Sequence, residues 1–187
     1  MAMTREHLES FRDKGVPDLV DARVRLLFVG INPGLWTAAT GGHFGRPGNR
    51  FYPALAAAGI TEYVIGASEG LKAADREHLL SRGVGITNLV NRATARADEL
   101  GAEELRGGAE RLARTVAEWR PAVVAVAGIT AYRQAFARPR ALAGRQPEDL
   151  LGAELWVVPN PSGLNAHATL ASLGEAYRGP AVAAGIV

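Results

Sequence analysis

Two asparagines stand out because each directly follows an apolar run and lies beside proline and glycine. Asn32 is part of GINPG at 30–34, after the apolar run 26–29, and Asn160 begins NPSG at 160–163, after the run 155–158. An asparagine amide can orient a water molecule through hydrogen bonds, but it does not take a proton at neutral pH. Neither motif contains a carboxylate that could act as a general base. These residues therefore predict a site that works through hydrogen bonds.

Each motif also has a simpler interpretation, because Asn-Pro-Gly after a strand is a common turn. The pair is harder to explain in that way. The apolar runs before the motifs are typical of buried strands in a parallel sheet, whose carboxyl ends lie at one edge. Open α/β sheets bind their ligands at that edge. We therefore expect the two loops to converge on one cleft.

The elements that must position these loops follow from the apolar pattern of the chain. The alternation of strands and helices predicts an α/β fold, a three-layer αβα sandwich with a central, mostly parallel sheet. Strands are predicted at 24–30, 84–90, 122–127 and 155–158. Helices are predicted at 4–14, 48–59, 72–81, 102–119, 129–136 and from 170 through 177, with a Gly-rich loop at 35–47, a loop at 61–70 and an irregular basic segment at 138–149.

Length and composition are those of a single domain. The chain has 187 residues, of which 48% are hydrophobic, so we predict one domain over 1–187 with an N-terminal helical extension at 1–22. The absence of cysteine excludes disulfides, thiolate metal sites and a cysteine nucleophile. The first residues lack the pattern of a signal peptide, and no apolar run is long enough to span a membrane. The sequence therefore predicts a soluble, cytoplasmic protein that does not contact membranes.

The basic residues are mostly arginine, with Lys14 and Lys72 as the only lysines, and the net charge is +2. This small excess permits a polyanionic partner without requiring one. Arginine suits bidentate contact with phosphate, although a bias in genomic composition is the simpler reason for a chain rich in Arg and Ala. Schiff-base chemistry is not expected, because neither lysine lies in a motif.

Three segments carry a family resemblance. They are GINPG at 30–34 with GHFGRPGNRF at 42–51, GITNLVNRAT at 85–94, and NPSGLNAH at 160–167. The first and third resemble the two signature motifs of the mismatch-specific uracil-DNA and thymine-DNA glycosylases, the second branch of the uracil-DNA glycosylase superfamily. The likeness spans about residues 25–178. It implies the uracil-DNA glycosylase fold and hydrolysis of an N-glycosidic bond without a cofactor or metal.

The resemblance assigns catalytic roles to the two asparagines. Asn32 matches the position that holds the attacking water. Related branches carry an aspartate there, so a slower enzyme is expected. Asn160 stands where the strict uracil enzymes carry a catalytic histidine, so the departing base loses a strong hydrogen-bond donor.

Four residues are assigned to the base pocket by the same resemblance. Gly34 stands where the strict enzymes have a tyrosine that excludes a 5-methyl group, so the pocket should admit 5-substituted or adducted pyrimidines; a glycine there also permits a tight turn. Phe44 matches the aromatic residue that stacks on the flipped base, and its alternative is a lid packed on the core. Backbone amides near Ile31 and Phe44 would read the uracil edge, and Asn49 belongs to the same pocket.

The second motif matches the DNA wedge of the family. Leu164 corresponds to the apolar side chain that fills the space left by a flipped nucleotide, and Gly163 and Asn165 to the residues that read the orphaned guanine. An exposed leucine is otherwise ordinary. The best-known bacterial member has an arginine at the position of Ala166, and we expect His167 to replace it in part.

Phosphate contacts are predicted from polar and cationic side chains around the motifs. The candidates are Ser162, His167, Arg92 and Arg96, with Arg46 and Arg50 as further cations. The alternative for the arginines is a solvated charged face. The other histidines, His7, His43 and His78, show no ligand spacing, so no metal site is predicted. Of these, His43 adjoins Phe44 and is the one that could touch a substrate.

The resemblance and the residues together predict a monofunctional DNA glycosylase that acts as a monomer on double-stranded DNA. It would flip and release uracil opposite guanine, with thymine or ethenocytosine as weaker or alternative targets, and leave the abasic site uncut. An alternative of another class is a module that binds lesions or abasic sites without cleaving them. A third reading, an unrelated α/β enzyme that binds a nucleotide phosphate, lacks a P-loop or dinucleotide fingerprint.

Overall fold

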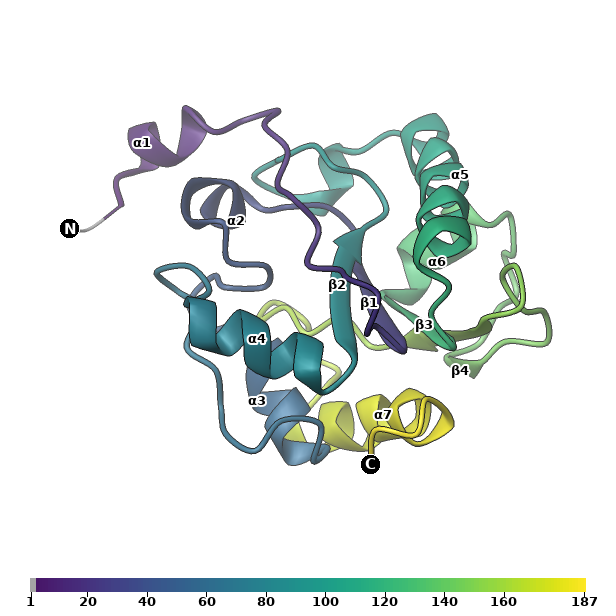
Figure 1. Cartoon of the computed structure of the whole chain (residues 1–187). Helices are drawn as coiled ribbons and strands as arrows, with labels where there is room; N and C mark the ends of the chain where they lie inside the picture. The colour runs from purple at the N-terminus through teal and green to yellow at the C-terminus, as the bar shows by residue number, and fades with distance from the viewer. Residues whose placement is uncertain (1–2) are drawn as a thin grey trace.

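The computed structural model describes residues 3–187. Within them it contains one five-stranded sheet, which Figure 1 shows between helices. Its strands are β1 (Leu26–Gly30), β2 (Val84–Asn88), β3 (Val123–Ala127), β4 (Gly144–Arg145) and β5 (Glu154–Val158). The strand order is β2-β1-β3-β5-β4. All neighbouring strands are parallel except β4, which runs antiparallel to β5 at the edge.

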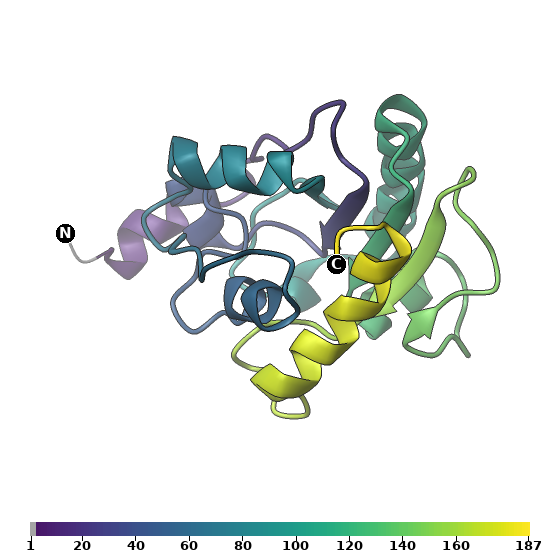
Figure 2. The ribbon, with the colours of Figure 1, turned by 60° about the horizontal axis from the view of Figure 1, so that its bottom comes forward.

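Helices cover both faces of this sheet. They are α1 (Arg5–Glu9), α2 (Leu35–Thr40), α3 (Phe51–Ala57), α4 (Ala73–Ser81), α5 (Ala102–Trp119), α6 (Ile129–Ala135) and α7 (Leu170–Ala183), with a 3-10 turn, η1 (Ala97–Glu99). In Figure 1, α3, α4 and α7 lie on one side of the sheet, and α5 and α6 on the other. Figure 2 shows α3 and α7 side by side on their face.

The central strand β1 shows why the sheet needs both layers. All five of its residues are buried. Leu26 and Phe28 belong to the core formed with α3 and α7, whereas Leu27 and Val29 belong to the core formed with α5 and α6. Successive side chains of a strand point to opposite faces, so a continuous apolar run requires cover on both. The predicted three-layer α/β fold is confirmed.

Three local predictions were wrong. The loop predicted at 35–47 contains α2, which ends where Gly41 adopts a φ of 73°. The irregular segment at 138–149 contains β4, which pairs with Trp156 and Val157. The first helix begins as predicted, with the Thr4 side chain accepting a hydrogen bond from the His7 N–H at 3.2 Å, but it ends at Glu9.

The strand register brings the predicted motifs to one edge of the sheet. Gly30, which precedes the first motif, pairs with Asn88 at the end of β2. Ala127 pairs with Val158, which precedes the second motif. The loops after β1, β2, β3 and β5 therefore leave the sheet at the same edge. In the described part of the chain, no helix is both long and apolar enough to cross a bilayer.

Candidate active site

A cavity of about 160 Å³ lies at this edge of the sheet. Asn32 and Asn160 both line it, as expected for loops that follow parallel strands of one sheet and leave it at the same edge, although β3 lies between β1 and β5. All of the residues predicted for the base pocket also line it: Ile31, Gly34, Phe44 and Asn49. The fold thus brings the two halves of the predicted site together.

The amide of Asn32 is held in one orientation by acceptor groups. Its Nδ2 donates to the Arg92 carbonyl oxygen and to Thr94 Oγ1, both at 2.8 Å. The Thr94 hydroxyl donates its own hydrogen to the Arg96 carbonyl at 2.7 Å, so it can only accept from Asn32. Nothing in residues 3–187 donates to Asn32 Oδ1. This oxygen is therefore available to accept a hydrogen bond from a water molecule.

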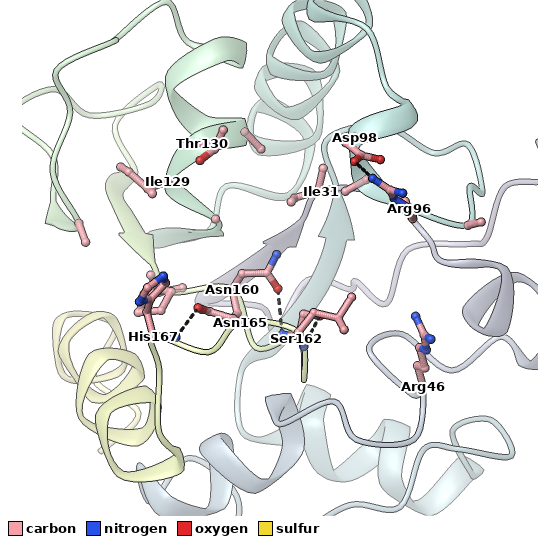
Figure 3. Close-up of a pocket in the computed structure, with 18 residues that line it drawn as sticks. Ile31, Arg46, Arg96, Asp98, Ile129, Thr130, Asn160, Ser162, Asn165 and His167 are labelled. Carbon is pink, nitrogen blue, oxygen red and sulfur yellow. Dashed lines mark hydrogen bonds and ion pairs between the residues drawn. The ribbon is translucent and has the colours of Figure 1, made fainter.

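The amide of Asn160 is oriented the other way. Its Oδ1 accepts the Ser162 N–H at 2.9 Å, and Figure 3 shows the amide nitrogen directed away from Ser162. No described residue accepts a hydrogen bond from that nitrogen. The two asparagines therefore contribute different groups, an acceptor oxygen from Asn32 and a donor N–H from Asn160.

The side chain of Arg50 supports the loop after β5, residues 160–168, through hydrogen bonds. The guanidinium donates to the carbonyl oxygens of Ser162 at 2.7 Å, Asn165 at 2.8 Å, and Ala168. The Arg50 backbone N–H also donates to the Pro161 carbonyl at 2.9 Å. Arg50 is consequently not the free phosphate-binding cation that was predicted, because Nη1 and Nη2 donate to these carbonyls and Nε is buried without a partner in the described part of the chain.

The tip of this loop projects into solvent. Leu164 is 82% exposed. Its N–H donates to Ser162 Oγ at 3.2 Å, so the Ser162 hydroxyl accepts a hydrogen bond within the turn and keeps its own hydrogen to donate. A Cβ on Gly163 would lie 2.8 Å from the Gly48 carbonyl oxygen, so glycine is needed where the loop approaches the segment before α3. The predicted wedge is therefore an exposed apolar side chain on a supported loop.

A larger cleft of about 1120 Å³ extends from the loop across the sheet edge (Figure 3). Leu164, Asn165, Ser162 and His167 line it on one side. Residues 95–98 and the start of α6 line it as well. Asn160 borders both the large cleft and the small cavity, so the two spaces are adjacent.

Comparison with known families agrees with this geometry. The family model described as the uracil DNA glycosylase superfamily matches residues 17–181, nearly the whole chain. The chain belongs to the uracil-DNA glycosylase superfamily. Membership implies a hydrolase that excises uracil from DNA, and it confirms the broader part of the predicted resemblance.

The fold of this superfamily member is also similar to a solved structure. A candidate uracil DNA glycosylase from Methanosarcina acetivorans, determined by solution NMR, aligns with a TM-score of 0.60 and 18% sequence identity. The alignment covers 93% of this chain and 98% of that one. At this level of identity the similarity concerns the fold alone.

One cavity residue of the glycosylase was not predicted from the sequence. Asn88, 4% exposed, is the last residue of β2 and lines the small cavity. Its Nδ2 has no hydrogen-bond partner in the described part of the chain. A Cβ on Gly30 would lie 2.4 Å from Asn88 Oδ1, so glycine at position 30 makes room for it. The signal was present in GITN, a polar residue at the end of an apolar run, as with Asn32 and Asn160.

Further hydrogen-bond donors of the glycosylase surround the same space. Asn49 Oδ1 accepts the Phe51 N–H at 2.9 Å, and the Asn49 amide nitrogen donates to no acceptor among the described residues. The backbone N–H groups of Ile31 and Phe44 donate to no acceptor within residues 3–187. Carbonyl oxygens of a bound base would therefore meet several donors that the protein does not use itself.

Phe44 packs on the core and lines the cavity at the same time. Its ring stacks on Phe51 with centroids 4.1 Å apart. Its backbone has a φ of 54°, which is uncommon for an aromatic residue. One face of the Phe44 ring therefore packs on the core, as the lid interpretation predicts. Stacking of the other face on a base is a proposal.

His43 connects the N-terminal segment to this cavity. Its imidazole is buried, and Nε2 donates to the Pro17 carbonyl oxygen at 2.8 Å. Burial lowers the pKa of His43, so the ring is neutral at neutral pH. No three His, Asp or Glu side chains within residues 3–187 are grouped so that they could hold a metal ion.

The predicted phosphate contacts differ in their surroundings. Arg96 and His167 line the large cleft, and Arg96 forms an exposed ion pair with Asp98. Arg92 does not line that cleft. Its guanidinium lies 2.6 Å from Glu104 and 2.7 Å from Asp13, so a phosphate would have to displace two carboxylates. The structure favours Arg96 and Arg46 over Arg92 as cations that DNA could reach.

Proposed function

We propose that the protein is a monofunctional DNA glycosylase that hydrolyses the N-glycosidic bond of uracil opposite guanine in double-stranded DNA. Thymine and ethenocytosine opposite guanine are proposed as further targets. The observation that carries this proposal is the fixed amide of Asn32, whose Oδ1 is left as an unused acceptor beside a cavity rich in unused donors.

Cleavage of this bond needs a positioned water and a stabilised leaving group. As the bond breaks, positive charge develops on the sugar and negative charge on the base. A water that donates a hydrogen bond to Asn32 Oδ1 would be held for attack on the sugar carbon, and its proton would pass to solvent, because an amide does not accept it. The donors of Asn160, Asn49 and Asn88 would stabilise the oxygens of the departing base.

Access to the cavity requires the nucleotide to leave the helix. Leu164 would fill the space that the nucleotide vacates, and the backbone of Gly163 and Asn165 would contact the orphaned guanine. A wobble pair costs less to open than a Watson-Crick pair, which adds selectivity before chemistry begins. No lysine lies among the residues lining the cavity, so the reaction ends at the intact abasic site.

Asn88 provides a test of the base pocket. Replacing Asn88 with leucine should slow the single-turnover release of uracil about tenfold, because a donor to the base is lost. The melting temperature should not fall. Asn88 Nδ2 is buried without a hydrogen-bond partner, which costs folding free energy, and a leucine side chain would not carry that desolvation cost. An unchanged rate, or a slower rate with marked destabilisation, would contradict the role of Asn88 in binding the base.

The proposed function is tested by single-turnover release from matched duplexes with G·U, A·U, G·T and G·ethenocytosine pairs, beside single-stranded uracil. The fastest release is expected from G·U. Equal release from A·U and single strands would show that the opposite guanine is not read by the loop at 160–168. Tight duplex binding with no release of any base would support instead the alternative of a module that binds lesions or abasic sites.

A further inference from the structure

Arg46 is an exposed cation that no group in the described part of the chain neutralises. Its guanidinium makes no ion pair and donates no hydrogen bond within residues 3–187, and Figure 3 draws no interaction from it. By contrast, Arg92 lies between two carboxylates, Arg96 pairs with a third, and Arg50 donates to backbone carbonyls. Arg46 therefore keeps its full charge and all of its donors for a ligand.

The backbone that carries this side chain is held in place. Arg46 belongs to the loop before α3, residues 42–49. Its carbonyl oxygen accepts the Asn49 N–H at 2.9 Å, which closes a turn. The Tyr52 hydroxyl, on α3, donates to the His43 carbonyl oxygen at 2.8 Å and ties the loop to the core. The position of Arg46 is thus fixed at its backbone, and its side chain can turn toward a ligand.

Arg46 lies where several spaces meet. It lines both the small cavity and the large cleft, and it also lines two further clefts of about 600 and 220 Å³. Among the described residues that line the small cavity, Arg46 alone carries a charge, because His43 is neutral and the other polar groups are amides and hydroxyls. A negatively charged group in this cavity would therefore meet one cation and no carboxylate.

Cleavage of the N-glycosidic bond produces such a group. The bonding electron pair leaves with N1 of uracil, and the negative charge spreads over the two carbonyl oxygens of the base. The cavity of about 160 Å³ is small enough that a base inside it lies within a few ångströms of the lining groups. A unit charge at such a distance acts more strongly once the duplex covers the large cleft and excludes water.

We propose that Arg46 is a catalytic residue that stabilises the departing base as an anion. The inference rests on the proposed function and adds to it the group that carries the countercharge. The guanidinium donates hydrogen bonds to the base while the bond breaks, and it gives up no proton. The attacking water adds to the sugar carbon and loses its proton to solvent, and the released base anion takes a proton from solvent. The amides in the cavity donate hydrogen bonds without a charge, so Arg46 supplies what they lack.

The test compares single-turnover release of uracil and 5-fluorouracil, each opposite guanine in the same duplex, with enzyme at saturating concentration. Fluorine withdraws electrons and makes the base a better leaving group, so its release depends less on stabilisation by the protein. Arg46→Ala removes the charge and the donors, Arg46→Gln keeps amide donors without the charge, and Arg46→Lys keeps the charge. Arg96→Ala is the matched control, because Arg96 lines the large cleft but not the small cavity.

We expect Arg46→Ala to slow the release of uracil about 50-fold and that of 5-fluorouracil only about fivefold. Arg46→Gln should behave like Arg46→Ala, and Arg46→Lys should keep most of the wild-type rate. Arg96→Ala should change both rates by the same factor. The melting temperature of the Arg46 variants should equal that of the wild type, because the Arg46 side chain is exposed and has no partner within residues 3–187.

Equal losses on the two bases in Arg46→Ala would show that Arg46 contacts a phosphate and not the departing base. That result, or an unchanged rate in Arg46→Ala or Arg46→Gln, would overturn the inference while leaving the glycosylase activity in place. A wild type that releases neither base would instead refute the proposed function, and the role of Arg46 with it.

Discussion

Replacing Asn32 with alanine is expected to lower the single-turnover rate of uracil release about 10²–10³-fold. The affinity for the duplex should stay within about twofold of wild type, because Asn32 contributes to the reaction more than to DNA contact. The rate falls because Asn32 Oδ1 is the acceptor available to hold the water, while both hydrogens of Nδ2 are used by Arg92 and Thr94. Without the amide, a water in the cavity is not directed at the sugar.

Asn91 offers a matched control for this variant. It lies on the same loop as Arg92 and Thr94, but its Oδ1 accepts the Val16 N–H at 2.8 Å, and it does not line the cavity. Asn91→Ala should therefore lower the melting temperature without a comparable loss of rate. If Asn32→Ala and Asn91→Ala release uracil equally fast, Asn32 does not hold the water.

Replacing Arg50 with alanine is expected to abolish most of the discrimination between G·U and A·U duplexes and to lower the free energy of unfolding by about 3 kcal/mol. Three backbone carbonyls of the loop at 160–168 would lose their donor, and the loop that presents Leu164 would no longer be held in one conformation. The measurements are chemical denaturation and the ratio of single-turnover rates on the two duplexes.

Arg133→Ala is the control that separates a loss of stability from a loss of discrimination between G·U and A·U. Arg133 also donates through Nε and Nη2 to a backbone carbonyl, that of Ala141, at 2.9 and 2.6 Å, but it lies outside the cavity and the large cleft. The Arg133→Ala variant should have a lower free energy of unfolding and an unchanged ratio of single-turnover rates on G·U and A·U duplexes. Arg50→Lys, which keeps the charge with fewer directed donors, should fall between wild type and Arg50→Ala. A folded Arg50→Ala variant that still prefers G·U would show that the loop does not depend on this support.

The strands and the longest helix could be predicted from the sequence because their signals are local. The residues of β1 and β3 form continuous buried apolar runs, and α5 spans Ala102–Trp119 as its apolar period predicts. Short elements could not be predicted. With six residues, α2 covers less than two helical turns and stands between glycines, and the two residues of β4 carry no periodic pattern.

The site could be predicted where a residue type follows directly from its place on a strand. Asn32 and Asn160 were recognised because each follows an apolar run. Asn88 was missed because the predicted strand continued to residue 90, whereas β2 ends at Asn88. Ion pairs and long-range hydrogen bonds could not be read in this way. The partner Asp13 of Arg92 is 79 residues away, and the acceptors of Arg50 are 112 to 118 residues away. In each case the sequence shows a cation without its acceptors.

The long separation between Arg50 and its acceptors also bears on the order in which the protein is made. Synthesis proceeds from the N-terminus, so Arg50 leaves the ribosome well before residues 162–168 exist to receive its hydrogen bonds. A nascent chain that ends before β5 lacks Asn160 and Leu164 as well. Under the proposed function, opening of a base pair therefore requires that residues 160–168 have left the ribosome, and a fragment released before that point would not attack DNA.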